Sequence, residues 1–348
     1  MINADPRISI VITDINMPIM TGLELLNHIN EMKDNKIKVI IISAYSDMGN
    51  IRYAMNKGAF DFLTKPIDLE DLERTISKTV EIVQFIRESY EARDQLDNYS
   101  KELYAANQIQ QAILPKVFPP FPKIKSFDIY GHMEAAKMIG GDFFDFFLIG
   151  ENKIGFVIGD VSGKGTPAAL FMAISRTVLQ TLGKTGISPE ECISLANLSL
   201  CKESVDSMFV TVFYAILDYT TGDLTYVNAG HNYPIIIKPD GNVFQLIEET
   251  CMILGAFDTA KYTSRTYKLE PNSMIILYTD GVNEATDINN KQYGNDALLR
   301  FLTYSDNKNS PTAINKGIFN AVKLYSKDCE QTDDISVLTL SYYGERHL

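Results

Sequence analysis

The chain has 348 residues, of which 45% are apolar and 22% are charged, and its net charge at pH 7 is −12. These values are typical of a globular protein long enough for two or three domains. The acidic balance argues against non-specific nucleic-acid binding through a basic surface. No stretch approaches 18 uninterrupted apolar residues, so we expect no membrane span. The N-terminus lacks the basic and apolar regions of a signal peptide, which predicts a cytoplasmic protein.

The four cysteines and four histidines are too few and too scattered to suggest a common metal site. The cysteine spacing shows neither a metal-binding nor a redox pattern, which is typical of thiols in a reducing compartment. Because a His/Cys zinc site is disfavoured, any metal would rely on oxygen ligands, and such ligands favour magnesium or manganese.

Residues 1–68 alternate strand-like and helix-like segments. The β-branched runs "ISIVITD" (8–14) and "IKVIIIS" (37–43) are typical of parallel strands that are covered on both faces. Between them, residues 22–32 have the apolar spacing of a helix. This order predicts an α/β domain.

Residues 69–114 contain no glycine or proline and carry apolar side chains at three-and-four spacing. They predict one long helix, or two helices with a break near residues 91–95. The narrow apolar stripe is typical of a two-stranded coiled coil. At about 1.5 Å per residue the helix would be roughly 65 Å long, more than one small domain covers, so we expect a homodimer through this linker. The alternative is a helix that packs on its own domain.

Residues 115–348 read as strand pairs and helices in separate runs. Hairpins are predicted at 217–227 and 235–247, and helices at 167–182, 189–203, 295–304 and 311–326. Such a pattern indicates an α+β layered fold.

Aspartates recur at the ends of apolar strands in this third region. The stretches are "GGDFFDF" with Asp142, "GDVSGKG" with Asp160, "YTDGVNEA" with Asp280, and "TDDISVL" with Asp333 and Asp334. Converging carboxylates repel one another unless cations lie among them. Two divalent ions about 3.5–4 Å apart would bind them, hold a phosphate and ionise a water.

These four stretches, together with "NAGHNYP", resemble the bacterial metal-dependent serine/threonine phosphatases, the sporulation- and sigma-factor-regulating branch of the type-2C family, over residues 115–342. The resemblance implies an α-β-β-α sandwich that holds two manganese or magnesium ions. It implies Asp142, Asp160, Asp280 and Asp333 as catalytic metal ligands, with the backbone carbonyl of Val161. It also implies a phosphorylated protein as substrate and suggests an anti-sigma-factor antagonist. Asp333 is preferred to Asp334 because the first acid of the pair matches the family ligand.

Several neighbouring residues are weaker candidates. Ser162 stands where eukaryotic relatives have a histidine as general acid, so the proton donor stays open, with a metal-bound water as one alternative. His231 is a substitute donor only if it is not structural, and we favour the structural interpretation. Lys164 either attracts phosphate or is a solvated turn residue. Glu284 and Asp145 rank below the four aspartates.

The segment "VITDINMPIMTGLELL" resembles the phosphoacceptor region of two-component response regulators. The resemblance implies Asp14 as phosphoacceptor, Ser43 and Tyr45 as switch residues, Lys65 as phosphate contact, and a cognate histidine kinase as partner. Only thirteen residues precede Asp14, and the family's acidic strand some forty residues upstream has no counterpart. We therefore expect a receiver without its N-terminal half and with impaired phosphorylation.

The sequence thus predicts a partial receiver (1–68), a helical, coiled-coil linker (69–114) and a metal-dependent protein phosphatase domain (115–348). Two alternatives stay open. One is a non-catalytic dimeric signalling scaffold, and the other is a phosphatase of a small phosphorylated messenger.

Overall fold

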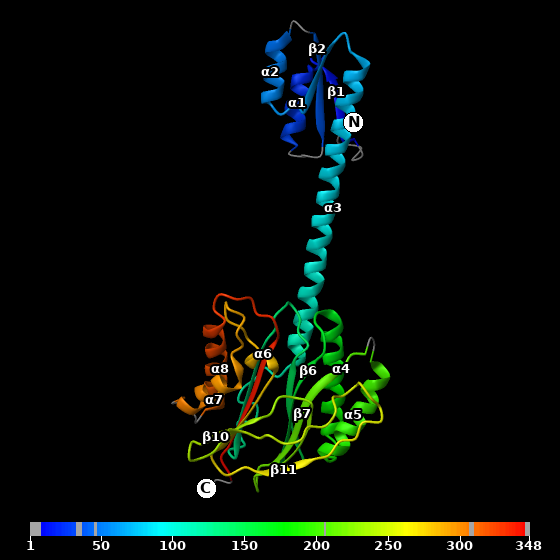
Figure 1. The fold of residues 1–348 in the computed structure, drawn as a ribbon. Helices are drawn as coiled ribbons and strands as arrows, with labels where there is room; N and C mark the ends of the chain where they lie inside the picture. The colour runs from blue at the N-terminus through cyan, green and yellow to red at the C-terminus, as the bar shows by residue number, and fades with distance from the viewer. Residues whose placement is uncertain (1–7, 33–36, 45–46, 205–206, 306–309, 345–348) are drawn as a thin grey trace. The chain divides into compact units, whose positions relative to one another are not determined.

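The computed structural model describes residues 8–32, 37–44, 47–204, 207–305 and 310–344 (Figure 1). The chain divides into two compact units, Met1–Glu102 and Leu103–Leu348. The division falls inside a long helix.

The first unit is a three-stranded parallel sheet, in the order β1-β2-β3, with helices between the strands. Its elements are β1 (Ile10–Asp14), α1 (Gly22–Glu31), β2 (Lys38–Ala44), α2 (Met48–Asn56) and β3 (Asp61–Lys65). Thr21 and Glu24 form a capping box that begins α1. The central strand β2 is the most buried, with Ile40 and Ile41 fully enclosed, whereas Ile12 of the edge strand β1 is 41% exposed. The predicted alternation of parallel strands and helices is confirmed.

Helix α3 (Leu69–Ile113) is a single unbroken helix, so the one-helix alternative is confirmed. With no proline or glycine inside it, nothing in its sequence interrupts the backbone hydrogen bonds. Phe85, Leu96, Tyr99 and Ile109 are exposed apolar side chains along it. None of the helices in the described part of the chain has the length and hydropathy that a bilayer crossing requires.

The second unit contains two five-stranded antiparallel sheets. One has the order β10-β9-β12-β13-β4 and the other β11-β8-β7-β6-β5. The first sheet consists of β4 (Phe127–Glu134), β9 (Ile235–Ile237), β10 (Val243–Gln245), β12 (Ser273–Tyr278) and β13 (Ile335–Tyr342). The second consists of β5 (Phe143–Ile149), β6 (Lys153–Val161), β7 (Val210–Asp218), β8 (Asp223–Ala229) and β11 (Arg265–Lys268). Both predicted hairpins are confirmed, as β7–β8 and β9–β10.

Helices cover the outer faces of both sheets (Figure 1). The β5–β8 side carries α4 (Thr166–Gly183) and α5 (Pro189–Glu203). The β4/β13 side carries α7 (Gly294–Tyr304) and α8 (Pro311–Tyr325), and the short α6 (Asp280–Asn283) follows β12. All four predicted helices are present.

Strand β5 shows how the sequence fills both faces of its sheet. Side chains alternate along a strand, so 143, 145 and 147 face one side while 142, 144 and 146 face the other. Phe147 packs against Gly183 of α4, where an added Cβ would lie 2.4 Å from the ring. Phe144 packs against Gly131 of β4, where an added Cβ would lie 2.3 Å from the ring. Odd positions therefore face the helices and even positions face the second sheet.

Candidate active site

The four aspartates singled out from the sequence lie at one end of the two sheets. Asp142 immediately precedes β5 and Asp160 is near the end of β6, and the pairing of Phe143 with Gly159 makes these strand ends neighbours. Asp280 follows β12 and Asp333 precedes β13, which pair antiparallel in the other sheet. Each sheet thus contributes two carboxylates to the same region.

Hydrogen bonds between the two sheets join these strand ends. The Thr279 hydroxyl donates to Asp142 Oδ2 at 2.7 Å, and the backbone N–H of Ser336 donates to the same hydroxyl oxygen at 2.9 Å. The backbone N–H of Gly141 donates to Asp334 Oδ2 at 2.6 Å. Thr279 is fully buried. The sequence analysis does not identify it as a site residue, although it directly precedes the candidate ligand Asp280. It orients Asp142.

Burial and mutual repulsion destabilise the ionised carboxylates. Burial, with repulsion from Asp160 and Asp334, raises the pKa of Asp142 well above its ordinary value. Burial, with repulsion from Asp280 and Asp333, raises the pKa of Asp160 to about 7. Burial, followed by repulsion from Asp333, raises the pKa of Asp280 to about 6. A positive charge among these groups would relieve that cost.

The adjacent acids Asp333 and Asp334 have different surroundings. Asp334 is surrounded by backbone, accepting from the N–H groups of Ala136 at 2.8 Å and Gly141 at 2.6 Å. The backbone carbonyl oxygen of Asp334 lies 2.0 Å from where a Cβ of Gly281 would be. Position 281 therefore has no room for a side chain. Asp333 is 38% exposed, and its Oδ2 lies 3.0 Å from Lys164 Nζ. Asp334 therefore holds the loop, while Asp333 faces a cation.

Asp145 lies on the opposite face of β5 from Asp142, as strand alternation requires. Its buried carboxylate forms an ion pair with Arg176 at 2.9 Å and accepts from Gln180 Nε2 at 2.7 Å. Both partners belong to α4, one helical turn apart. Asp145 thus attaches α4 to the sheet and is not part of the acidic cluster.

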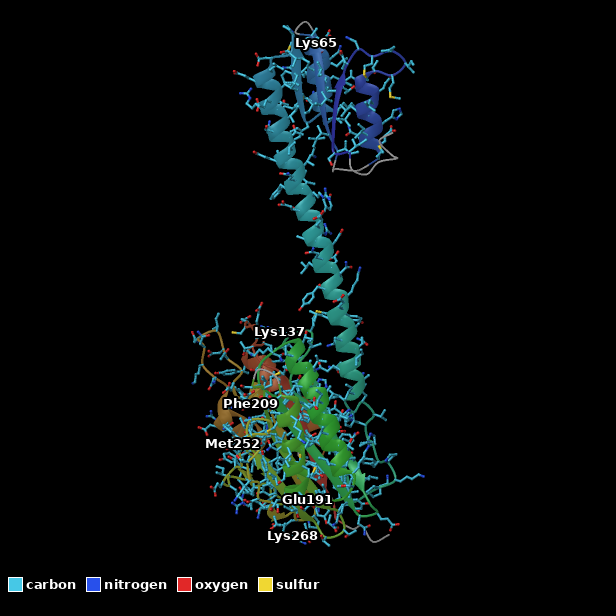
Figure 2. All side chains as sticks on the ribbon, turned by 90° about the vertical axis from the view of Figure 1, so that its right-hand side faces the viewer. Lys65, Lys137, Glu191, Phe209, Met252 and Lys268 are labelled. Atoms are coloured by element: carbon cyan, nitrogen blue, oxygen red, sulfur yellow. The ribbon has the colours of Figure 1, made fainter. Side chains whose placement is uncertain are left out.

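Ser162, which replaces the histidine of eukaryotic relatives, and the candidate donor His231 both form hydrogen bonds with residues outside the acidic cluster. The Ser162 hydroxyl accepts from the backbone N–H of Phe209 at 3.0 Å, a residue labelled in Figure 2. His231 is buried, bonds to Thr211 Oγ1 through Nδ1 at 2.9 Å, and has a pKa lowered by burial to about 4. A neutral, enclosed imidazole fits the structural interpretation of this histidine. Glu284 is exposed, and it contributes to the raised pKa of Asp280.

The carboxylates of the acidic cluster are not arranged around a common point as the ligands of a bound ion are. Within the described ranges, no group of three or more His, Cys, Asp or Glu side chains is disposed to hold one ion. The Lys164 ammonium is the cation that contacts Asp333 in this arrangement.

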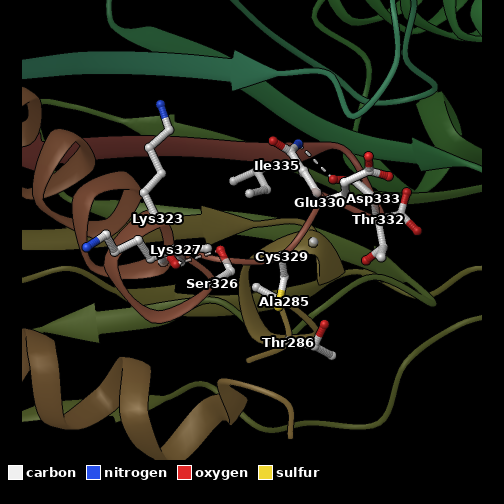
Figure 3. Close-up of a pocket in the computed structure, with 13 residues that line it drawn as sticks. Ala285, Thr286, Lys323, Ser326, Lys327, Cys329, Glu330, Thr332, Asp333 and Ile335 are labelled. Carbon is white, nitrogen blue, oxygen red and sulfur yellow. Dashed lines mark hydrogen bonds between the residues drawn. The ribbon is translucent and has the colours of Figure 1, made fainter. Parts of the chain in front are cut away.

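A pocket of about 320 Å³ opens beside Asp333 (Figure 3). The residues that line it include Gly281, Thr286, Lys327 and Thr332. The nearby Lys323 forms an ion pair with Glu134 at 2.7 Å. The pocket therefore shares Asp333 with the acidic cluster and is flanked by lysines.

In the first unit, the receiver-like residues come together at the strand ends. Asp14 at the end of β1 forms an ion pair with Lys65 at the end of β3, and Lys65 is labelled in Figure 2. The bond from Lys65 lowers the pKa of Asp14. Ser43 is buried in β2 and donates to Asp47 Oδ2 at 3.4 Å. Tyr45 lies outside the described residues.

Comparisons with known proteins match a family to each of the two units. The family described as Stage II sporulation protein E (SpoIIE) matches residues 150–343, more than half of the chain, and the response regulator receiver domain family matches residues 2–77. Protein IcfG of Synechocystis sp. is 30% identical over 229 residues, which cover 58% of this chain and 36% of that protein. The phosphoserine phosphatase RsbU of Bacillus subtilis is 29% identical over 277 residues, covering 78% of this chain and 80% of RsbU.

Solved structures show the same fold for the second unit. The SiaA-PP2C domain of Pseudomonas aeruginosa has a TM-score of 0.59 at 19% identity, over 71% of this chain and 98% of that one. The PP2C phosphatase domain of SpoIIE from Bacillus subtilis, solved with a fragment of its regulatory domain, has a TM-score of 0.55 at 18% identity, over 64% of this chain and 66% of that one. The chain therefore belongs to the SpoIIE family, as a response regulator receiver domain fused to a serine phosphatase domain of the PP2C type.

Proposed function

We propose that the second unit removes phosphate from phosphoserine or phosphothreonine of a protein substrate, with two divalent ions, manganese or magnesium, as cofactors. The observation that carries this proposal is the convergence of Asp142, Asp160, Asp280 and Asp333 from the ends of two different sheets. Buried carboxylates that raise one another's pKa destabilise the folded protein, so a purely structural role does not account for them.

The donor set fits hard divalent cations. All four side chains are carboxylates, and the Val161 carbonyl adjoins Asp160, so every proposed ligand atom is oxygen. The backbone N–H bonds that both oxygens of Asp334 accept favour Asp333 over Asp334 as the ligand. When bound, the ions would supply positive charge to the phosphate and favour ionisation of a nucleophilic water.

The remaining residues orient and hold this set. Thr279 fixes the direction of Asp142, and Asp334 fixes the loop that precedes it. Lys164 keeps a positive charge beside Asp333 at the exposed side of the cluster, where a phosphate would approach. His231 is buried and bonded to Thr211, which favours a structural role over one as general acid, and we assign no proton donor among the side chains.

The substrate proposal rests on similarity and on the pocket. RsbU and RsbP of Bacillus subtilis are phosphoserine phosphatases, and RsbP is 26% identical over 194 residues. We extend this to an anti-sigma-factor antagonist as substrate, whose residues next to the phosphoserine would bind in the pocket beside Asp333. The family membership favours this activity over a non-catalytic scaffold and over a small-messenger phosphatase.

The first unit and the linker complete the proposal. Asp14 is the proposed phosphoacceptor, contacted by Lys65, with Ser43 and Tyr45 as switch residues and a histidine kinase as the partner. Residues 69–114 are the proposed linker between a receiver domain at 1–68 and a phosphatase domain at 115–348. The exposed apolar side chains of α3 support pairing with a second copy of the chain, and we propose the cytoplasm as its location.

Release of phosphate from a phosphoserine protein tests the proposal. The wild-type chain with Mn²⁺ is expected to release phosphate, and Asp160→Asn is expected to lose the activity. The exposed Asp258, outside the cluster, offers Asp258→Asn as a matched control that should retain it. Equal rates in wild type and Asp160→Asn would contradict the mechanism, and hydrolysis of small phosphate esters alone would favour a small-molecule substrate.

A further inference from the structure

The segment "NAGHNYP" (residues 228–234) carries the chain from β8 of one sheet to β9 of the other. Its first residue, Asn228, is buried and closes the segment into a turn. Asn228 Oδ1 accepts from the His231 N–H at 2.8 Å, and Asn228 Nδ2 donates to the His231 carbonyl at 3.0 Å. Both backbone polar groups of His231 are thereby held, which fixes the point from which its side chain and the next one extend.

From this turn the His231 ring reaches the sheet that contains Asp160. Its Nδ1 lies 2.9 Å from Thr211 Oγ1. Thr211 of β7 is paired with Asp160 of β6, and the Thr211 hydroxyl lies 3.4 Å from the Asp160 carbonyl oxygen. Burial lowers the pKa of His231 to about 4, and the backbone carbonyl of Tyr278 acts in the opposite direction, so the ring also lies near the end of β12. Asp280 follows two residues after Tyr278.

The next side chain of the turn contacts the helix that begins at Asp280. Asn232 Nδ2 donates to Asn283 Oδ1 at 2.9 Å. Asn283 is the last residue of α6, whose first residue is Asp280. Because α6 is only one turn long, and the Glu284 N–H donates to the Asp280 carbonyl at 2.7 Å, a displacement of Asn283 is transmitted to Asp280.

We infer, building on the proposed function, that His231 and Asn232 are positioning residues for the metal site. Together they fix the separation between Asp160 and Asp280. These carboxylates belong to different sheets, so the strand pairing within a sheet does not set the distance between them. Ions held by ligands from both sheets require that distance to be kept within about 0.5 Å. Two adjacent side chains of one closed turn, each bonded to the support of one carboxylate, supply this constraint.

The test uses the full-length chain and variants matched in shape. His231→Phe keeps a ring without its nitrogens, and His231→Asn restores a polar group near the position of Nδ1. Asn232→Leu keeps the branched shape and removes the donor. The exposed Asn242, beyond the other end of β9, supplies the control Asn242→Leu. Asn232 is half-buried, so Asn232→Leu tests the inference even if His231→Phe does not fold.

The first readout is amide hydrogen exchange in metal-free protein. The loss of one hydrogen bond predicts about five- to tenfold faster exchange near the lost partner. Asn232→Leu should show this increase at residues 279–285, and His231→Phe should show it at residues 209–213. Asn242→Leu should exchange at the wild-type rate in both segments. Wild-type exchange at residues 279–285 in Asn232→Leu would overturn the inference.

The second readout, Mn²⁺ affinity measured by calorimetry, separates positioning from stability. Affinity should fall about tenfold or more in His231→Phe and in Asn232→Leu, because residues that orient metal ligands typically change affinity by about 10- to 100-fold. It should recover in part in His231→Asn and stay unchanged in Asn242→Leu. Faster exchange with wild-type Mn²⁺ affinity would overturn the inference, since the turn would then only stabilise the fold. If the wild-type chain bound no Mn²⁺, the proposed function would fail, and the exchange readout would still decide whether the turn holds α6 and β7.

Discussion

The Thr279 hydroxyl offers a direct test of how the site is held together. Thr279→Val keeps the shape of the side chain but removes an oxygen that donates to Asp142 and accepts from the Ser336 N–H. Thr279→Ser keeps the oxygen and removes only a methyl group. The pair therefore separates the hydrogen bonds from the packing.

The structure sets the expected magnitudes. The lost Thr279–Asp142 hydrogen bond is worth about 0.5–1.5 kcal/mol, and the orphaned Ser336 N–H costs about 1–3 kcal/mol. Thr279→Val should therefore lower the free energy of unfolding by about 1.5–4.5 kcal/mol. Thr279→Ser loses one buried methyl group, which predicts about 1 kcal/mol.

The assay has to report on the second unit alone, because the chain has two compact units. Pulsed hydrogen exchange in urea, read at the peptide that contains β5, measures unfolding of that unit. The predicted order of stability is wild type, then Thr279→Ser, then Thr279→Val. If the valine variant were as stable as the serine variant, the hydroxyl would not hold Asp142 as described.

Three further predictions concern the acidic cluster and the buried ion pair of Asp145 on the opposite face of β5. Lys164→Ala is expected to bind Mn²⁺ several-fold more tightly, because it removes a competing cation 3.0 Å from Asp333; unchanged affinity in calorimetry would contradict this role. Arg176→Met is expected to destabilise the unit by about 3–5 kcal/mol in urea unfolding, since it leaves Asp145 buried without its ion pair, and Asp145→Asn in the same background should recover part of that loss. In metal-free protein, Asp160 and Asp280 have pKa values raised to about 7 and about 6, so their contribution to stability is complete below about pH 4 and is lost as pH rises to about 7. Mn²⁺ should therefore raise the melting temperature more at pH 7.5 than at pH 5.5, and an equal rise at both pH values would argue against the cluster as the binding site.

The acidic cluster could be predicted from the sequence because its members share a local pattern. Asp142, Asp160, Asp280 and Asp333 each adjoin a strand end, and sheet topology brings such ends together. Asp142 and Asp145 lie in one apolar stretch, but the alternation of side chains along a strand places them on opposite faces of the sheet. The same local logic predicted the hairpins, the parallel strands and the long helix.

The supporting residues could not be predicted because their partners are remote and their chemistry is ordinary. Thr279 and Asp142 are 137 positions apart, the side-chain amide of the buried Gln110 donates to the Gly140 carbonyl 30 positions later, and Arg176 is paired with Asp145 only after α4 packs on β5. A threonine, a glutamine and an arginine in helices or strand ends have many uses, so position in the folded chain decides among them. The distinction between Asp333 and Asp334 likewise depends on backbone N–H groups contributed by residues almost 200 positions away.

The stoichiometry of Mn²⁺ binding tests the central claim most directly. Isothermal titration calorimetry of the full-length chain at pH 7.5 is predicted to show two Mn²⁺ ions per chain. Asp142→Asn and Asp160→Asn should each weaken binding by at least tenfold, because each removes a charged oxygen ligand from the cluster. No Mn²⁺ binding by the wild-type chain, or unchanged binding by both variants, would contradict the account.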